Sequence, residues 1–363
     1  MLDGRPPRRR ECPSTRSACL PRPGGRGGGR RLTIATLAIG LSLTFLPACG
    51  VRAPTSAALG LFVPSQNPTD AVTLAKQLGI TLQGVSGYTT GTTWATIGKY
   101  EPPTTSLRLF LSVSMSPDDG KPSQTPAHLG VYRELAQNLV TGGQARAIVR
   151  IGWEWSAPYF SWSPQHTTPG QYVTAFRDIA TTMRRVPGEH FQFDWCSNSG
   201  SVPTNGPFAA SFPGDAYVDY VGTDQYDNPG TSWIDDLNSI GGLAYTVAFA
   251  KAHGKRVSIP EWGLNGNDDP TFVDLMHSFI ADPGNEVAYS SYFSDAGAIN
   301  SDITLFPHAE VELTREFGAA RASRPAHATR APGQNSKGEK RPESPSALER
   351  PPWVPGGEAA PTL

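Results

Sequence analysis

Cysteine is scarce in this 363-residue chain. Only four cysteines occur, and Cys12, Cys19 and Cys49 all precede residue 50. Cys196 stands alone in the rest of the sequence, so no disulfide framework can form there. The sequence also lacks zinc-type cysteine spacing and an H-E-x-x-H motif. We therefore predict a fold that its hydrophobic core stabilises, with no metal and no organic cofactor.

Positive charge is sparse in the central part of the chain. Residues 32–318 hold 15 Lys and Arg against 26 Asp and Glu, a net charge of −11. Nucleic acids and anionic lipids bind surfaces with concentrated positive charge, so neither is an expected partner. An acidic field instead suits a neutral ligand and disfavours a polyanionic one.

Long hydrophobic runs are also missing. The longest, LTIATLAIGLSLTFL at 32–46, has fifteen residues and follows an Arg-rich segment. A membrane-spanning helix needs about 20 residues, so this run fits the hydrophobic region of a signal peptide. The LPACG that follows resembles the lipobox of bacterial lipoproteins, which implies lipid attachment to Cys49. An ordinary signal peptide is the alternative. We expect an exported protein, extracellular or anchored to the cell surface through that lipid alone.

Composition divides the chain into four parts. We predict a leader with a lipoprotein-type signal peptide over 1–49, a linker over 50–58, one folded domain over 59–318 and a disordered tail over 319–363. The tail is rich in Pro, Arg, Gly and Ser and has few large aliphatic residues, so burial cannot offset its ordering entropy. A translated frame shift is the alternative origin of such a tail.

Residues 59–318 alternate between two patterns. Short β-branched and aromatic runs are separated by longer amphipathic stretches, among them 126–140, 169–185 and 234–253. The first two open with Thr-Pro, which is typical of a helix start. Eight such runs predict an α/β fold, a single-domain (β/α)8 TIM barrel. An open doubly wound sheet is the alternative, but no Gly-rich phosphate turn follows the first run. The predicted strands are 59–65, 82–88, 107–115, 147–155, 191–198, 217–227, 256–264 and 287–295.

Two glutamates stand near the ends of predicted strands. Glu154 lies in VRIGWEW of the fourth strand and Glu261 in SIPEWG of the seventh. Strand alternation places Arg150, Gly152 and Glu154 on one inward face. A carboxylate at the end of a buried strand is costly unless it is hydrogen-bonded or used in chemistry. The structural alternative is an ion pair with a barrel arginine such as Arg150.

Two carboxylates across a cleft are what glycosidic-bond hydrolysis requires. One donates a proton to the leaving oxygen, and the other, about 5–5.5 Å away, attacks the anomeric carbon of the sugar. The fourth and seventh strands lie nearly opposite each other in a ring of eight, so their ends can face one another. Serine hydrolase chemistry is disfavoured because the G-x-S-x-G turn is absent.

Aromatic residues gather at the predicted strand ends, where sugar rings can stack on them. Asn198 could hydrogen-bond to sugar hydroxyls. For each ring the alternative is a place in the core. The candidate substrate-binding residues are Trp153, Trp162, Trp195, Asn198, Tyr226, Trp262 and Tyr292.

Several of these segments resemble glycoside hydrolase family 26, a retaining β-glycanase family with a (β/α)8 barrel that is best known for endo-β-1,4-mannanases. The resemblance implies that Glu154 is the proton donor and acid/base and that Glu261 is the nucleophile. It further implies that Tyr226 holds the nucleophile and that Trp162 stacks on sugar. The matching segments are FPGDAYVDYVGTDQYD (212–227), VRIGWEW (149–155), VPGEHFQFDWCSN (186–198) and IPEWG (259–263).

Two departures from the family pattern bear on the substrate. Trp153 stands where mannanases of the family commonly have His, and Tyr292 stands where Trp is frequent. Both are expected in the substrate cleft rather than at the carboxylate pair. They leave mixed-linkage β-glucan and β-1,3-xylan open beside mannan.

The sequence therefore predicts a secreted, monomeric, retaining endo-β-glycanase that acts by double displacement on a neutral β-linked polysaccharide, with β-1,4-mannan first. One rival is a non-catalytic glycan-binding lipoprotein. A second is a solute-binding lipoprotein of a transporter, which the eightfold repeat disfavours because such proteins have two lobes.

Overall fold

The computed structural model describes residues 57–89, 91–297 and 299–318. The predicted signal peptide, the lipidation site Cys49 and the tail lie outside these residues and remain predictions. Among the described helices, none has the length and apolar character that crossing a membrane requires.

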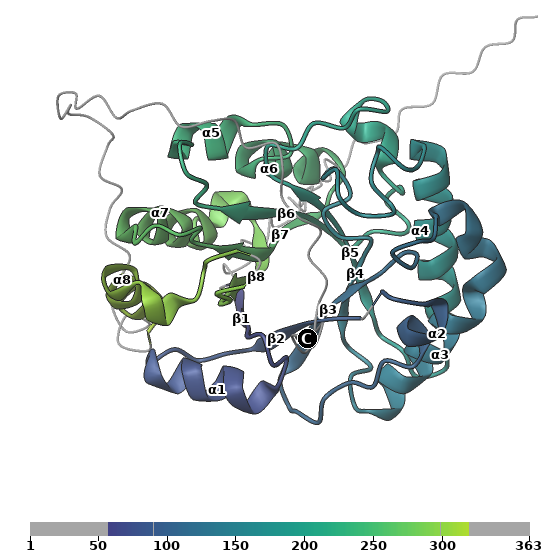
Figure 1. Ribbon diagram of the computed structural model, residues 1–363, viewed down its shortest axis with the longest axis horizontal. Helices are drawn as coiled ribbons and strands as arrows, with labels where there is room; N and C mark the ends of the chain where they lie inside the picture. Colours follow the sequence, from purple (N-terminus) through teal and green to yellow (C-terminus); the bar gives the residue numbers. More distant parts are fainter. Residues whose placement is uncertain (1–56, 90, 298, 319–363) are drawn as a thin grey trace, which may run out of the picture. The chain divides into compact units, whose positions relative to one another are not determined.

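Eight parallel strands form one sheet in the order β1-β8-β7-β6-β5-β4-β3-β2 (Figure 1). The two ends of this order meet, because the backbone N–H of Gln83 just before β2 donates to the Leu59 carbonyl of β1 at 2.9 Å. The predicted (β/α)8 barrel is confirmed. The strands are β1 Ala58–Phe62, β2 Gly84–Tyr88, β3 Arg108–Val113, β4 Ile148–Ile151, β5 Gln192–Asn198, β6 Tyr220–Tyr226, β7 Arg256–Gly263 and β8 Val287–Phe293.

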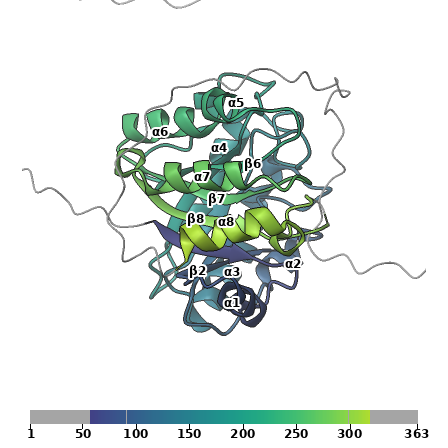
Figure 2. The ribbon, with the colours of Figure 1, turned by 90° about the vertical axis from the view of Figure 1, so that its left-hand side faces the viewer.

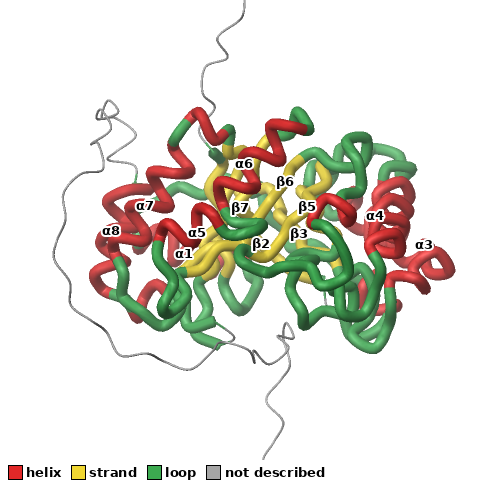
Figure 3. Tube along the Cα trace, turned by 90° about the horizontal axis from the view of Figure 1, so that it is seen from above, coloured by secondary structure: helices red, strands yellow, loops and turns green. Residues whose placement is uncertain are grey.

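Helices surround the strands, as Figures 2 and 3 show from two further directions. The link from β5 to β6 has only a short 3-10 turn in place of an α-helix. The α-helices are α1 Pro68–Gln77, α2 Trp94–Gly98, α3 Leu129–Thr141, α4 Pro169–Met183, α5 Trp233–Asn238, α6 Leu243–Ala252, α7 Pro270–Ala281 and α8 Pro307–Phe317. The 3-10 turns are η1 Pro122–His128, η2 Phe208–Ser211, η3 Pro283–Asn285 and η4 Ile303–Leu305.

Local signals explain where the predicted helices hold and where they do not. At the start of α4, the Thr168 side chain accepts the backbone N–H of Gln171, and proline occupies the first turn, as predicted. The stretch 126–140 instead begins with η1, and its α-helix starts only at Leu129. The stretch 234–253 is two helices, because Ser239 is extended and Gly241 has a φ of 67°.

The buried hydrophobic side chains form two clusters. Residues near the strand starts form a small buried cluster that closes the N-terminal end: Phe110, Ile148, Tyr220, Ala288 and Tyr289. A larger core lies elsewhere, and its biggest fully buried rings include Trp155, Trp195 and Trp262. The C-terminal end of the barrel, where barrel enzymes place their sites, lies opposite this closed end.

Candidate active site

Glu261 points into the barrel and is held by side chains from three other strands. The Tyr88 hydroxyl of β2 donates to Oε2 and the Tyr226 hydroxyl of β6 donates to Oε1. Arg150 Nη2 of β4 lies 3.4 Å from Oε2. Three donors suit an ionised carboxylate and fix its direction.

A break in strand register brings Glu261 to this position. Ser258 already faces the interior, where its hydroxyl donates to Asp194, so plain alternation would turn residue 261 outward. The pairing of β7 shifts on both sides, between Gly222 and Gln225 of β6 and between Ile259 and Trp262 along β7. Such irregularities re-aim side chains beside functional sites.

Glu154 reaches the site from a turn rather than from a strand. Strand β4 ends at Ile151, and Gly152 and Glu154 adopt left-handed backbone conformations with φ of 54° and 47°. The predicted alternation therefore holds for Arg150 but is wrong for Glu154. A non-glycine residue in this region costs about 1–3 kcal/mol, and such strain concentrates at functional sites. Asn198 Nδ2, at the end of β5, donates to Glu154 Oε1.

Arg150 pairs mainly with Asp224 of β6. Its Nη2 lies 2.9 Å from Asp224 Oδ2, closer than the 3.4 Å to Glu261, and Arg150 and Asp224 are both buried. The alternative in which Arg150 sequesters a glutamate is therefore disfavoured. Glu154 and Glu261 also retain 7% and 6% exposure, which leaves each a route to solvent.

Burial dominates the electrostatics of these groups. It raises the pKa of the Asp224 carboxyl; the charge of Arg150 opposes this rise, and Glu261 and Glu154 add to it. Both glutamates are thus within electrostatic range of one carboxyl. For Arg150, burial disfavours the charge, but Asp224 and other neighbours outweigh it and raise its pKa.

The two tyrosines that hold Glu261 are constrained chemically and sterically. Burial first, and then the charge of Glu261, raises the pKa of Tyr88 and of Tyr226, so both remain donors at ordinary pH. The ring of Phe293 packs edge-on against both, and Phe62 packs against Tyr88 at 5.2 Å. Aromatic packing therefore holds the rings of Tyr88 and Tyr226 in place, and their hydroxyls in turn orient the Glu261 carboxylate.

Two of the predicted sugar-binding rings form a layer next to this site. Trp153 lies 5.4 Å from the Tyr88 ring and 4.8 Å from that of Trp162, whose indole N–H donates to the Trp153 carbonyl at 2.9 Å. Phe160 stacks on Trp162 at 4.8 Å. Both tryptophans are 3% exposed, so this layer supports the site, and their contact with sugar remains a prediction.

Three other predicted sugar contacts are corrected. Trp195, Trp262 and Tyr292 are at most 1% exposed. Trp195 stacks on Trp155 at 5.2 Å and packs on the helix α6, and Trp262 packs on α7 and α8. The Tyr292 hydroxyl donates to the Ser301 carbonyl. These rings are core between strands and helices, because they follow or precede inward-facing residues on their strands.

Tyr88 is the functional residue that sequence reasoning missed. Its only sequence signal is an aromatic residue at the end of the predicted strand 82–88. That signal is weak, because many strands end on an aromatic core residue. The contact with Glu261 joins residues 173 positions apart, and closure of the barrel creates it.

A polar pocket of about 240 Å³ lies between the loops that follow β6 and β7. Asp227 lines it, and burial followed by the charge of Asp269 raises the pKa of this carboxyl. Amide side chains of Asn228, Asn265 and Asn267 line it as well. The pocket therefore offers hydrogen-bonding groups next to the end of β6.

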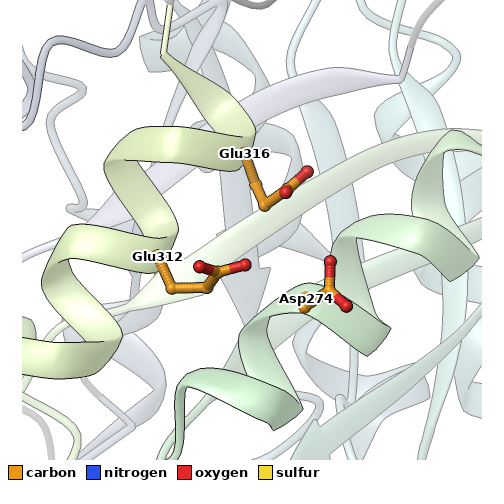
Figure 4. A group of neighbouring side chains, drawn as sticks. All are labelled: Asp274, Glu312 and Glu316. Carbon is orange, nitrogen blue, oxygen red and sulfur yellow. The ribbon is translucent and has the colours of Figure 1, made fainter. Parts of the chain in front are cut away.

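One acidic group could attract a cation, but a guanidinium already lies within it. Asp274 of α7 and Glu312 and Glu316 of α8 lie close together (Figure 4). Arg315 contacts all three, at 3.4 Å from Asp274 and closer to both glutamates. His277 Nδ1 lies 2.7 Å from Glu316. These side chains link two outer helices, so this group is a structural ion-pair network.

Comparison with known sequences connects this geometry to one family. Residues 88–263 match the family model described as glycosyl hydrolase family 26. The matched segment begins at Tyr88 and includes Glu154, Tyr226 and Glu261. A mannan endo-1,4-beta-mannosidase from Bifidobacterium adolescentis is 27% identical over 117 residues, which cover 30% of this chain and only 11% of that protein.

Solved structures share the barrel. A modular endo-beta-1,4-mannanase from Cellulomonas fimi aligns with a TM-score of 0.53 and 17% identity over 70% of each chain. A family 26 beta-mannanase from Bacteroides ovatus aligns with a TM-score of 0.52 and 14% identity over 74% of this chain and 89% of its own. Residues 88–263 are therefore similar to glycosyl hydrolase family 26, and the solved structures show that the fold is shared.

Proposed function

We propose that this protein is a retaining endo-β-glycanase that hydrolyses a neutral β-linked polysaccharide, with β-1,4-mannan as the first candidate. The observation that carries the proposal is the environment of Glu261, whose two carboxylate oxygens accept hydrogen bonds from Tyr88 and Tyr226. Glu154, on a turn after β4, supplies the second carboxyl that glycoside hydrolysis needs.

In the first step, Glu261 attacks the anomeric carbon of the bound sugar, and the bond from that carbon to the leaving oxygen breaks. Glu154 transfers its proton to that oxygen, so the leaving chain departs as a neutral alcohol. The product is a covalent glycosyl-enzyme ester on Glu261. Arg150 and the tyrosines keep the carboxylate aligned for this attack.

In the second step, Glu154, now ionised, removes a proton from water. The water oxygen bonds to the anomeric carbon and the ester bond to Glu261 breaks, which restores both side chains. Two inversions at one carbon retain its configuration. The Asn198 amide orients Glu154 in both steps through its bond to Oε1.

The substrate class follows from charge and from the relatives. The net charge of −11 over 32–318 disfavours polyanionic sugars. The relatives described above carry mannanase names, which supports β-1,4-mannan. Trp153 packs on Tyr88 where family mannanases commonly have His, so mixed-linkage β-glucan and β-1,3-xylan remain test substrates. Export, a lipid anchor at Cys49 and a monomeric state belong to the same proposal and rest on the sequence alone.

The test measures new reducing ends after the purified protein is incubated with each of the three glycans. Nuclear magnetic resonance of the first product reports whether the anomeric configuration is retained. Glu154→Gln and Glu261→Gln should each lower kcat by about 10³-fold or more. A loss of this size is expected when a catalytic group is removed. Glu134→Gln, an exposed glutamate of α3, is the matched control and should leave kcat unchanged.

A glycan-binding protein without turnover is the second candidate. It would show binding to one of these glycans with no release of reducing ends, and Glu261→Gln would leave its affinity unchanged. Turnover that survives both glutamate substitutions contradicts the proposed mechanism, as does an inverted first product.

A further inference from the structure

The barrel holds a buried carboxylate that the proposed reaction does not use. Asp194 of β5 is fully buried. Its Oδ2 accepts hydrogen bonds from Ser258 of β7, at 2.6 Å, and from Tyr289 of β8. Its Oδ1 is also buried and has no hydrogen-bond partner among the described residues.

Arg150 carries the matching donor. Its Nε–H is buried and likewise lacks a partner among the described residues. Arg150 and Asp194 are direct register partners in the β4–β5 pair, and both side chains face the barrel interior. Adjacent strands lie about 4.8 Å apart. An unpaired donor and an unpaired acceptor therefore lie on neighbouring residues at the same level of the barrel.

A glycine packs closely against this level of the barrel, where a side chain would not fit. A Cβ at Gly222 of β6 would lie 2.9 Å from Asp194 Oδ1 and 2.5 Å from Ser258 Oγ. Any side chain there would press on the very oxygen that lacks a partner. Buried polar groups are nearly always satisfied by protein or by ordered water, and internal waters occupy polar sites with two to four partners.

We propose that Asp194 is a positioning residue for Glu261, acting through Arg150 by way of one buried water that accepts from Arg150 Nε–H and donates to Asp194 Oδ1. The proposal rests on the function proposed above, because it assigns Asp194 an effect on the nucleophile. Nη2 of the same guanidinium faces Asp224 at 2.9 Å and Glu261 at 3.4 Å. A hold on Nε fixes the plane of the guanidinium and thereby the direction of Nη2.

The charge of Asp194 changes in a useful pH range. Burial raises the pKa of Asp194 to about 6, while Ser258, Tyr289 and Arg150 oppose the rise. The negative charge of ionised Asp194 partly offsets the positive charge of Arg150, so Arg150 stabilises the ionised form of Glu261 less strongly. The other titratable groups that face or influence Asp194 are Cys196 on its own strand, Asp219 before β6 and Tyr172 of α4.

The first experiment is a high-resolution crystal structure of the wild-type protein. We expect one ordered water within hydrogen-bond distance of both Arg150 Nε and Asp194 Oδ1. Density without such a water, and without a direct contact between the two atoms, overturns the proposal. This measurement requires neither activity nor a variant that folds.

The second experiment compares Asp194→Asn with the wild type in pH profiles of kcat on the hydrolysed glycan. The amide has one oxygen, which Ser258 and Tyr289 already use as acceptor, so the variant loses both the acceptor for the water and the charge. We expect kcat to fall about tenfold with little change in KM, since Asp194 does not touch substrate. The acidic limb should move to lower pH by roughly half a unit or more, because Arg150 then acts more strongly on Glu261. An unchanged kcat and profile overturns the proposal.

Asp215→Asn is the matched control, since Asp215 is exposed and pairs with His253 away from the barrel interior. It should change neither kcat nor the pH profile. If the wild type hydrolyses no glycan, the proposed function fails. The role of Asp194 can then still be tested by a measurement that does not require turnover. Carbon-13 resonances of the Glu261 carboxyl then report its titration, which Asp194→Asn should move to lower pH and which an uncoupled Asp194 would leave in place.

Discussion

The Tyr226 hydroxyl at the end of β6 donates to one oxygen of Glu261 in the neighbouring strand β7. The other oxygen is held from the far side of the ring by Tyr88 of β2. A carboxylate restrained on both oxygens loses rotational freedom before substrate arrives, which favours a single direction of attack.

Removal of either hydroxyl should slow catalysis without preventing folding. A hydrogen bond to a charged group contributes about 1.5–3 kcal/mol, so Tyr88→Phe and Tyr226→Phe should each lower kcat by roughly 10- to 150-fold. KM should change little, because the affected group is the proposed nucleophile. Steady-state kinetics on the best glycan measure both constants. Tyr217→Phe, a half-buried tyrosine beside Arg177, is the control, and a similar loss there would count against the assignment.

Loss of Arg150 should destabilise the barrel. Arg150→Ala leaves Asp224 buried without its cation, and breaking a buried pair costs about 3–5 kcal/mol of unfolding free energy. Urea denaturation followed by tryptophan fluorescence measures this difference. Arg184→Ala breaks a partly exposed pair with Asp219 and should cost about 1 kcal/mol or less. Equal losses in the two variants would contradict the central role of Arg150.

The buried tryptophans outside the barrel should matter for stability rather than for substrate affinity. Trp195→Ala and Trp262→Ala each remove a fully buried ring, which costs about 3–5 kcal/mol. Trp195→Phe and Trp262→Phe keep part of the packing and should fold with unchanged KM. A several-fold rise of KM in a folded Phe variant would contradict this assignment and indicate that the ring contacts substrate.

Stability should depend on pH through Asp194. The folded-state pKa is raised to about 6 from an unfolded value near 3.8, so the folded protein binds the extra proton between these values. Unfolding free energy from this group therefore falls as pH rises from about 4 to 6, by up to about 3 kcal/mol. Denaturation curves at pH 4.5, 5.5 and 6.5 should show a decline that Asp194→Asn reduces. A parallel decline in both proteins would contradict this titration.

Local sequence patterns were sufficient for the framework. The alternation of short β runs with amphipathic stretches predicted all eight strands, and Thr168-Pro169 marked the start of α4, because periodicity and capping act over a few residues. Glu154, Glu261 and Tyr226 were identified from strand-end segments, and the structure brings Tyr226 and Glu261 into contact.

Other features depended on contacts between distant segments. Tyr88 meets Glu261 only because the ring closes, and the register shift along β7 decides that Glu261 faces inward while Trp262 joins the core. The left-handed turn at Glu154 is stable because surrounding packing compensates its strain. Sequence alone determined which segments become strands and which carboxylates stand near their ends. Tertiary structure decided which way each side chain points, because register, bulges and long-range hydrogen bonds exist only once the strands have paired.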